Sequence, residues 1–143
     1  MKNRTKNIAS VAAIGLFSLF AIASVDEEPE STPAEMKAAA AEQSVTANKI
    51  AKDFDENEVA ANLKYENKII EVTGSVGQIS KDFGEYNLML DTSQLLTGVV
   101  CRFNGNVAEQ LAALKTGQKI TIKGRCDGMY GNVEIEDCVI ITK

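Results

Sequence analysis

The sequence predicts a mainly β protein: a five-stranded barrel with a helix between its third and fourth strands, preceded by a helical extension. Two observations support this fold class. Three segments between residues 69 and 103 alternate apolar and polar residues, as half-buried strands do. Between residues 114 and 141, a helix end leads into two more alternating segments joined by a glycine-marked turn, which is the pattern of a β-hairpin.

The first strand is expected over Ile69–Ser80, where apolar and polar residues alternate. Gly74 and Gly77 interrupt its apolar row. Glycines inside a strand mark a bulge or a sharp bend. Because the first strand of a small barrel must curve to serve two sheets, we expect it to bend at these glycines.

The second and third strands are expected over 86–90 and 99–103, where every second residue is apolar. Val107, Leu111 and Leu114 then recur at helical spacing, and a glycine ends this short helix. With the hairpin that follows, the order is strand, strand, strand, helix, strand, strand. This is the order of the OB fold, a five-stranded barrel that binds oligonucleotides and oligosaccharides.

The segment before the barrel is rich in helix-forming residues. Ala47, Ile50 and Phe54 share one helical face, and Val59 and Leu63 repeat the i, i+4 spacing. We expect one or two helices here that pack on the barrel or cover one of its open ends.

The N-terminus has the composition of a targeting segment. Three basic residues precede an uncharged apolar run over 8–23, and Ala21–Ala23 fits the small-residue pattern that signal peptidase reads. Residues 1–23 are therefore interpreted as a signal peptide of an exported protein, periplasmic or extracellular. An uncleaved membrane anchor is the alternative, although a spanning helix needs about 20 apolar residues.

Residues 24–45 are acidic, Pro/Ala-rich and contain both prolines, so they are interpreted as a linker. Residues 46–143 then form the helix plus OB-fold domain. Segment 1–23 carries three basic residues and no acidic ones, so its removal changes the formal net charge from −5 to −8. A protein this acidic repels polyanions such as DNA unless it has a local basic patch.

Several segments of the barrel resemble a known family. The segments are 62–74, 99–103, 114–118 and 124–128, followed by Asp137-Cys138. In this order and spacing they are similar to the tRNA_anti-like OB-fold family of exported bacterial proteins, many of them lipoproteins, over roughly residues 46–141. The resemblance implies an OB fold and no particular catalytic or binding residue. The chain departs from the lipoprotein members because it has no cysteine before Cys101 to carry a lipid.

Catalytic and metal-dependent functions find little support. The chain has no histidine, the side chain most used for proton transfer near neutral pH and the commonest metal ligand. There is no C-x-x-C pair to begin a zinc site. We therefore expect a protein that is not an enzyme, with no metal and no cofactor.

The OB ligand face lies on the second and third strands and is bordered by the loops joining strands one to two and four to five. On this chain that rule selects Lys81, Phe83, Tyr86, Arg102 and Tyr130 as the candidate ligand face. Aromatic side chains stack on bases or sugars, and basic groups meet phosphates. The alternative is that the aromatic residues belong to the core, because most of them alternate with apolar residues.

The cysteines Cys101, Cys126 and Cys138 are disulfide candidates, because export permits disulfides. Cys126 and Cys138 flank one hairpin and are slightly preferred. A simple hairpin register, however, pairs Cys126 nearer Ile135 than Cys138, and Cα atoms of a disulfide must approach to about 5.5 Å. Cys101 with Cys138 is the rival pair, and three buried reduced thiols are the third reading.

The function predicted from the sequence is an exported, non-catalytic OB-fold binding or interaction module. Its partner is expected to be an envelope protein, a glycan or a small ligand. Single-stranded nucleic-acid binding through the face of strands two and three is the alternative. A basic patch on that face favours nucleic acid, and an acidic face counts against it.

Overall fold

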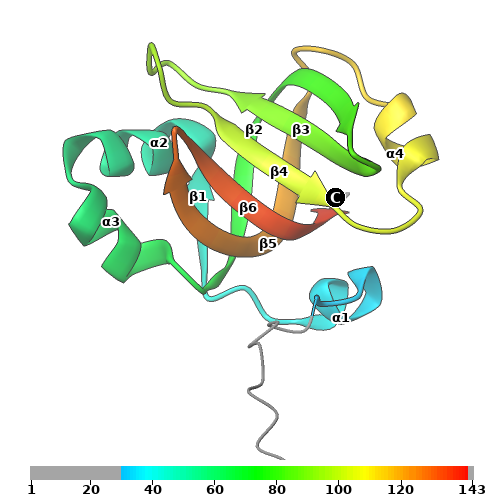
Figure 1. Ribbon diagram of the computed structural model, residues 1–143, viewed down its shortest axis with the longest axis horizontal. Coiled ribbons are helices and arrows are strands. Elements are labelled where there is room, and N and C mark those ends of the chain that lie inside the picture. Colours follow the sequence, from blue (N-terminus) through cyan, green and yellow to red (C-terminus); the bar gives the residue numbers. More distant parts are fainter. Residues whose placement is uncertain (1–29, 142–143) are drawn as a thin grey trace, which may run out of the picture.

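The computed structural model describes residues 30–141 (Figure 1). The predicted signal peptide, residues 1–23, lies outside this range. Among the described residues, no helix is both long and apolar enough to cross a lipid bilayer.

Five strands close into a barrel. They are β2 (Ile69–Asp82), β3 (Glu85–Asp91), β4 (Val99–Phe103), β5 (Lys119–Tyr130) and β6 (Asn132–Ile141). Neighbours follow the order β2-β3-β4-β6-β5, and β5 pairs again with β2. The helix α4 (Ala108–Ala112) lies between β4 and β5 in sequence. The predicted mainly β OB barrel, with its helix between the third and fourth barrel strands, is confirmed.

Of the two glycines at which β2 was expected to bend, only Gly77 lies at an irregularity, whereas Gly74 pairs with Ile120 in regular register. The register of β2 with β3 shifts between Val76 and Ile79, on either side of Gly77. A Cβ atom on Gly77 would lie 2.3 Å from an oxygen of the Asp91 side chain, which would have to turn away, and 3.1 Å from the backbone carbonyl oxygen of Met89, so a larger residue would crowd β3. The bulge lets one strand pair with β5 along its first half and with β3 along its second half.

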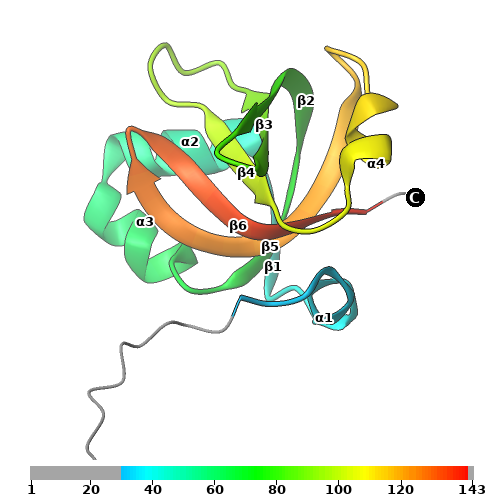
Figure 2. The same cartoon turned by 45° about the vertical axis from the view of Figure 1, so that its right-hand side comes forward.

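Two helices cover one end of the barrel, and α4 lies at the other (Figure 2). The helices are α2 (Ala47–Glu56) and α3 (Glu58–Tyr65). The predicted face of α2 is confirmed, since Ala47, Ile50 and Phe54 are all buried.

In α3 the expected apolar pair does not face the core. Val59 is 72% exposed and Leu63 is 80% exposed, whereas Ala61 and Tyr65 are buried. The Asn57 side chain caps the start of α3, so the helix begins afresh after α2 and turns a different i, i+4 pair inward.

Two elements not expected from the sequence lie within or at the edge of residues 24–45. The helix α1 (Pro33–Ala38) buries Met36, and the strand β1 (Gln43–Thr46) pairs in parallel with β2. A buried lysine on β5 holds α1 in place. The ammonium of Lys123 donates to the carbonyls of Lys37 and Ala39, at 2.8 and 2.7 Å. A cation at a helix C-terminus also opposes the negative end of the helix dipole.

Replacing Lys123 by methionine is expected to release α1 while leaving the barrel folded. Methionine retains most of the apolar stem, but it removes two charge-assisted hydrogen bonds, each worth about 1.5–3 kcal/mol. Hydrogen exchange should therefore quicken at the amides of α1 and not in β3 or β4. Lys119→Met, an exposed position on the same strand, is the control. Equal protection of α1 in both variants would contradict this account of α1 docking.

All three cysteines are free and buried in the structure, so the predicted disulfide is not confirmed. Cys126 lies opposite Ile135 across β5 and β6, as the simple hairpin register requires, and not opposite Cys138. The Cys138 thiol donates to the Ile135 carbonyl at 3.2 Å. Burial raises the pKa of Cys126 to about 11 and raises that of Cys138 well above its ordinary value. Both thiols are therefore neutral near pH 7 and poorly nucleophilic.

Candidate ligand face of the barrel

A groove of about 530 Å³ crosses the outer face of the barrel strands. Its lining residues are Gln78, Ser80, Asp82, Phe83, Glu85, Asn87, Met89, Val100, Arg102 and Glu134. We call this surface the barrel-face groove. The lining alternates along β2, β3 and β4, because every second residue of a strand points to the same side. This is the face on which OB folds bind their ligands.

The barrel-face groove is acidic. Three carboxylates line it, from Asp82, Glu85 and Glu134, against the single guanidinium of Arg102. That guanidinium is already paired: it lies 2.9 Å from the Glu134 carboxylate and 3.8 Å from that of Glu136. The groove therefore offers a polyanion no unpaired positive charge among its lining residues.

A charge network borders the groove. Carboxylate oxygens of Asp127, Glu134 and Glu136 lie within 4.8 Å of one another. Arg125 is 3.4 Å from Glu136, and Arg102 contacts both glutamates. Burial raises the pKa of Glu136, nearby Asp127 raises it further, and the two arginines oppose the change. The arginines thus compensate the clustered acids, and we interpret the cluster as a salt-bridge network.

The structure brings two of the five predicted ligand-face residues together. Phe83 and Arg102 both line the barrel-face groove. Lys81 and Tyr86 lie on the opposite side of their strands in a shallow depression against α4, with the Lys81 ammonium 4.9 Å from the centre of the Tyr86 ring. Tyr130 is exposed at the end of β5.

The β2 bulge turns Lys81 away from the barrel-face groove. Before it, even-numbered residues such as Val72 and Val76 are buried; after it, Gln78 and Ser80 face the outer groove. An uninterrupted alternation would have put Lys81 on the outer face. Gln78 faces the groove for the same reason. Asn87 lies on β3, where the alternation of buried Leu88 and Leu90 already directs it to the outer face.

Phe83 is held in an unfavourable backbone conformation. It has φ of +50° and is followed by Gly84 at +94°, so the β2–β3 turn has two successive left-handed residues. Such turns favour Asn-Gly, and a bulky residue with positive φ is strained. The Phe83 side chain is nevertheless fully exposed beside the groove. Because the ring gains no burial in return for this strain, Phe83 is a candidate contact residue of the groove.

Comparisons with known proteins agree with this architecture. The family model described as tRNA_anti-like matches residues 1–139. A Klebsiella pneumoniae protein, provisionally named a nucleic acid-binding lipoprotein, has a TM-score of 0.56 at 19% identity, covering 70% of this chain and 92% of that one.

Two further solved structures are less similar. The Stn1–Ten1 complex of S. pombe has a TM-score of 0.40 at 16% identity, covering 52% of this chain and 59% of that one. The OBody AM1L10, bound to hen egg-white lysozyme, has a TM-score of 0.43 at 17% identity, covering 56% of this chain and 85% of that one. No curated protein matches the chain.

Proposed function

The chain belongs to the tRNA_anti-like family, and from that premise we propose that it is an exported, non-catalytic binding module whose barrel-face groove takes up a neutral oligosaccharide. The observation that carries the proposal is the composition of the groove. Gln78 and Asn87 supply amides, the carboxylates supply acceptors, and Phe83 supplies an exposed ring. Sugar hydroxyls pair with amides and carboxylates, and sugar rings stack on aromatic faces.

Single-stranded nucleic acid is the second candidate ligand. The name of the Klebsiella protein favours it, and OB folds bind oligonucleotides. Against it stand three lining carboxylates and the prior pairing of Arg102 with Glu134. Nucleic-acid affinity comes mainly from phosphate contacts with unpaired basic groups, so an acidic groove disfavours this ligand.

Export is proposed from the basic and apolar N-terminal segment. We retain residues 1–23 as the signal peptide, with the mature chain beginning after Ala23. The intact mass of the protein, recovered separately from the membrane fraction and from the periplasm or medium, tests this, since cleavage removes 23 residues. A full-length mass would instead indicate the membrane-anchored alternative.

The ligand proposal is tested by an amide-resolved NMR titration of residues 24–143. A pool of neutral oligosaccharides is added first, then a short single-stranded oligonucleotide at low and at moderate salt. Saturable shifts at Gln78, Asn87 and Arg102 with sugars alone support the proposal. Shifts at the same residues with the oligonucleotide, weakened by salt, would replace it by nucleic-acid binding. If neither ligand shifted these amide signals, both proposed ligands of the barrel-face groove would be excluded.

Replacing Phe83 by asparagine is expected to separate stability from binding. Asparagine adopts positive φ readily and makes the turn Asn-Gly, so the free energy of unfolding should rise by about 0.5–1 kcal/mol. Loss of the stacking ring should also lower the affinity for the ligand by about tenfold, which corresponds to about 1.4 kcal/mol of binding free energy. Urea unfolding and ligand titration measure the two effects.

Leu95→Asn is the matched control for this variant, because Leu95 is an exposed apolar residue outside the groove lining. It should change neither quantity appreciably. If Phe83→Asn stabilised the protein and left ligand affinity intact, Phe83 would not be a contact residue.

A further inference from the structure

The strand β1 ends the sheet. Among the described residues it pairs with β2 on one side, and no strand follows it on the other. In Figure 1, β1 rises beside β2 and leads into α2, with α3 on its far side. Successive residues of a strand direct their backbone groups to alternate sides, so every second residue of β1 presents its N–H and C=O groups away from β2.

A second groove, of about 520 Å³, follows this edge. It is lined by all four residues of β1 together with Lys49, Lys64, Tyr65 and Thr73. We call it the β1-edge groove. Because residues from both faces of β1 contribute, the groove wraps the strand edge and does not merely lie on one face. It is therefore positioned where an added strand would pair.

The charge of the β1-edge groove is opposite to that of the barrel-face groove. Its lining contains the ammonium groups of Lys49 and Lys64 and no carboxylate. Both lysine side chains are about half exposed, at 56% and 49%. Both lysines pair with the carboxylate of Asp53, so this cluster carries one net positive charge on a protein of net charge −5. Charge complementarity selects an acidic partner.

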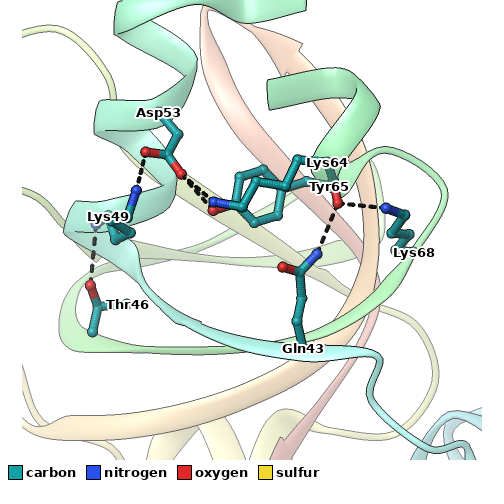
Figure 3. A network of polar contacts seen from close by, with 7 residues as sticks. All are labelled: Gln43, Thr46, Lys49, Asp53, Lys64, Tyr65 and Lys68. Atoms are coloured by element: carbon teal, nitrogen blue, oxygen red, sulfur yellow. Dashed lines mark hydrogen bonds and ion pairs between the residues drawn. The ribbon is translucent and has the colours of Figure 1, made fainter. Parts of the chain in front are cut away.

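A single aspartate behind the groove orients both lysines (Figure 3). The Asp53 carboxylate accepts from Lys49 through one oxygen. Through the other it accepts from Lys64 at 2.9 Å and from the Tyr65 hydroxyl at 2.6 Å. The Lys64 ammonium also lies 4.7 Å from the centre of the Tyr65 ring.

These contacts leave donors for a ligand. Each ammonium has three N–H donors, and Asp53 takes one from each lysine. Hydrogen bonds with Tyr65 and Asp53 raise the pKa of Lys64, so it stays charged. The pair is thus held in place before any ligand arrives, which lowers the entropy lost on binding.

We propose that the free edge of β1 binds an extended, acidic peptide segment of a partner protein as an added strand. The partner's backbone pairs with β1, as in other cases of strand addition. Its acidic side chains lie against Lys49 and Lys64. Ser44 and Thr46 are the exposed residues of β1 and have short side chains, which bond to the Glu71 carboxylate and to the Lys49 N–H. The site is separate from the barrel-face groove, so the protein would hold a ligand and a partner at the same time.

The test uses three synthetic peptides, a sulfated oligosaccharide and isotope-labelled protein of residues 24–143. The first peptide has seven residues that alternate threonine and glutamate, the second has lysine in place of glutamate, and the third repeats the first with alternate amides N-methylated. Amide shifts are followed at residues 43–46 and at Lys49. The acidic peptide should bind at least about tenfold more tightly than either of the others, a difference of about 1.4 kcal/mol.

Each other outcome overturns the proposal. Equal binding of the acidic peptide and its N-methylated form would show charge attraction without strand addition. Equal binding of the acidic and basic peptides would remove the role of the lysines. Shifts at residues 43–46 with a sulfated oligosaccharide and not with the peptides would make the groove a site for anionic glycans.

Substitution of the groove lysines tests the proposal independently. The double variant Lys49→Gln, Lys64→Gln should lower the affinity for the acidic peptide by about tenfold, because it loses two partly exposed charge pairs with the peptide. Lys52→Gln is the matched control, since Lys52 lies on the same helix and makes the same kind of pair, with Glu56, outside the groove. Thermal unfolding of each variant checks that the fold persists. Equal weakening by the double variant and by Lys52→Gln would contradict the assignment of the groove lysines.

Discussion

Replacing Gly124 by alanine is expected to destabilise the barrel by about 2–3 kcal/mol, because the added methyl overpacks a closed interior. A Cβ atom at Gly124 would lie 2.6 Å from the Ile135 side chain, 2.7 Å from the Glu136 carbonyl oxygen and 2.9 Å from the Cys138 sulfur. The carbonyl belongs to the backbone of β6 and cannot move aside without breaking the β5–β6 pairing. The register of this pair already shifts between Lys123 and Arg125.

Urea unfolding measures this loss. Gly98→Ala is the matched control, because the nearest atom to its new methyl is the Asn132 side-chain oxygen that accepts from the Gly98 N–H, and its distance of 3.2 Å exceeds all three contacts at Gly124. We expect Gly98→Ala to cost less than about 1 kcal/mol. Should Gly124→Ala cost no more than this control, the close approach of β5 and β6 at Gly124 would not be a determinant of the barrel's stability.

Replacing Asp53 by asparagine is expected to cost about 2 kcal/mol at neutral pH, since hydrogen bonds to charged groups are worth about 1.5–3 kcal/mol. Asp53 joins α2 to α3 through Lys64 and Tyr65. Its side chain is only 14% exposed, and the Tyr65 hydroxyl beside it belongs to a buried residue. Glu56→Gln is the control, because the pair of Glu56 with Lys52 is exposed and worth about 0–1 kcal/mol.

The cost of the Asp53 substitution should depend on pH. Burial alone would raise the pKa of Asp53, but hydrogen bonds from Lys49, Tyr65 and Lys64 lower it well below the ordinary value of 3.8. The folded carboxylate therefore binds a proton less readily than the unfolded one, and it stabilises the fold fully above pH 3.8. This contribution is lost as the pH falls below that value.

Chemical unfolding of both proteins across this pH range tests the linkage. The difference in free energy of unfolding between wild type and Asp53→Asn should be constant above about pH 5. It should become smaller as the pH falls toward about 2. A difference that does not change with pH would mean that Asp53 acts through shape or neutral hydrogen bonding, and not through its charge.

Local pattern in the sequence determined the barrel. Alternation of apolar residues located β3 and β4 within a residue or so, and spacing placed α4 between β4 and β5. Glycine chemistry located the bend in β2 at Gly77. These features depend on residues close in sequence, and burial of one strand face leaves a direct two-residue period.

Tertiary structure decided the two candidate sites. The β2 bulge shifts the alternation by one residue, so Gln78 and Ser80 face the barrel-face groove and Lys81 does not. The β1-edge groove depends on an unexpected strand and on Asp53, which joins two helices. The charge of a site is the sum of the charged side chains that folding brings there from segments distant in sequence. Composition gives only the net charge of the whole chain. The same acidic chain therefore has one acidic and one basic groove. The strand register decides which charged residues line the first, and the contact between α2 and α3 brings together the lysines of the second.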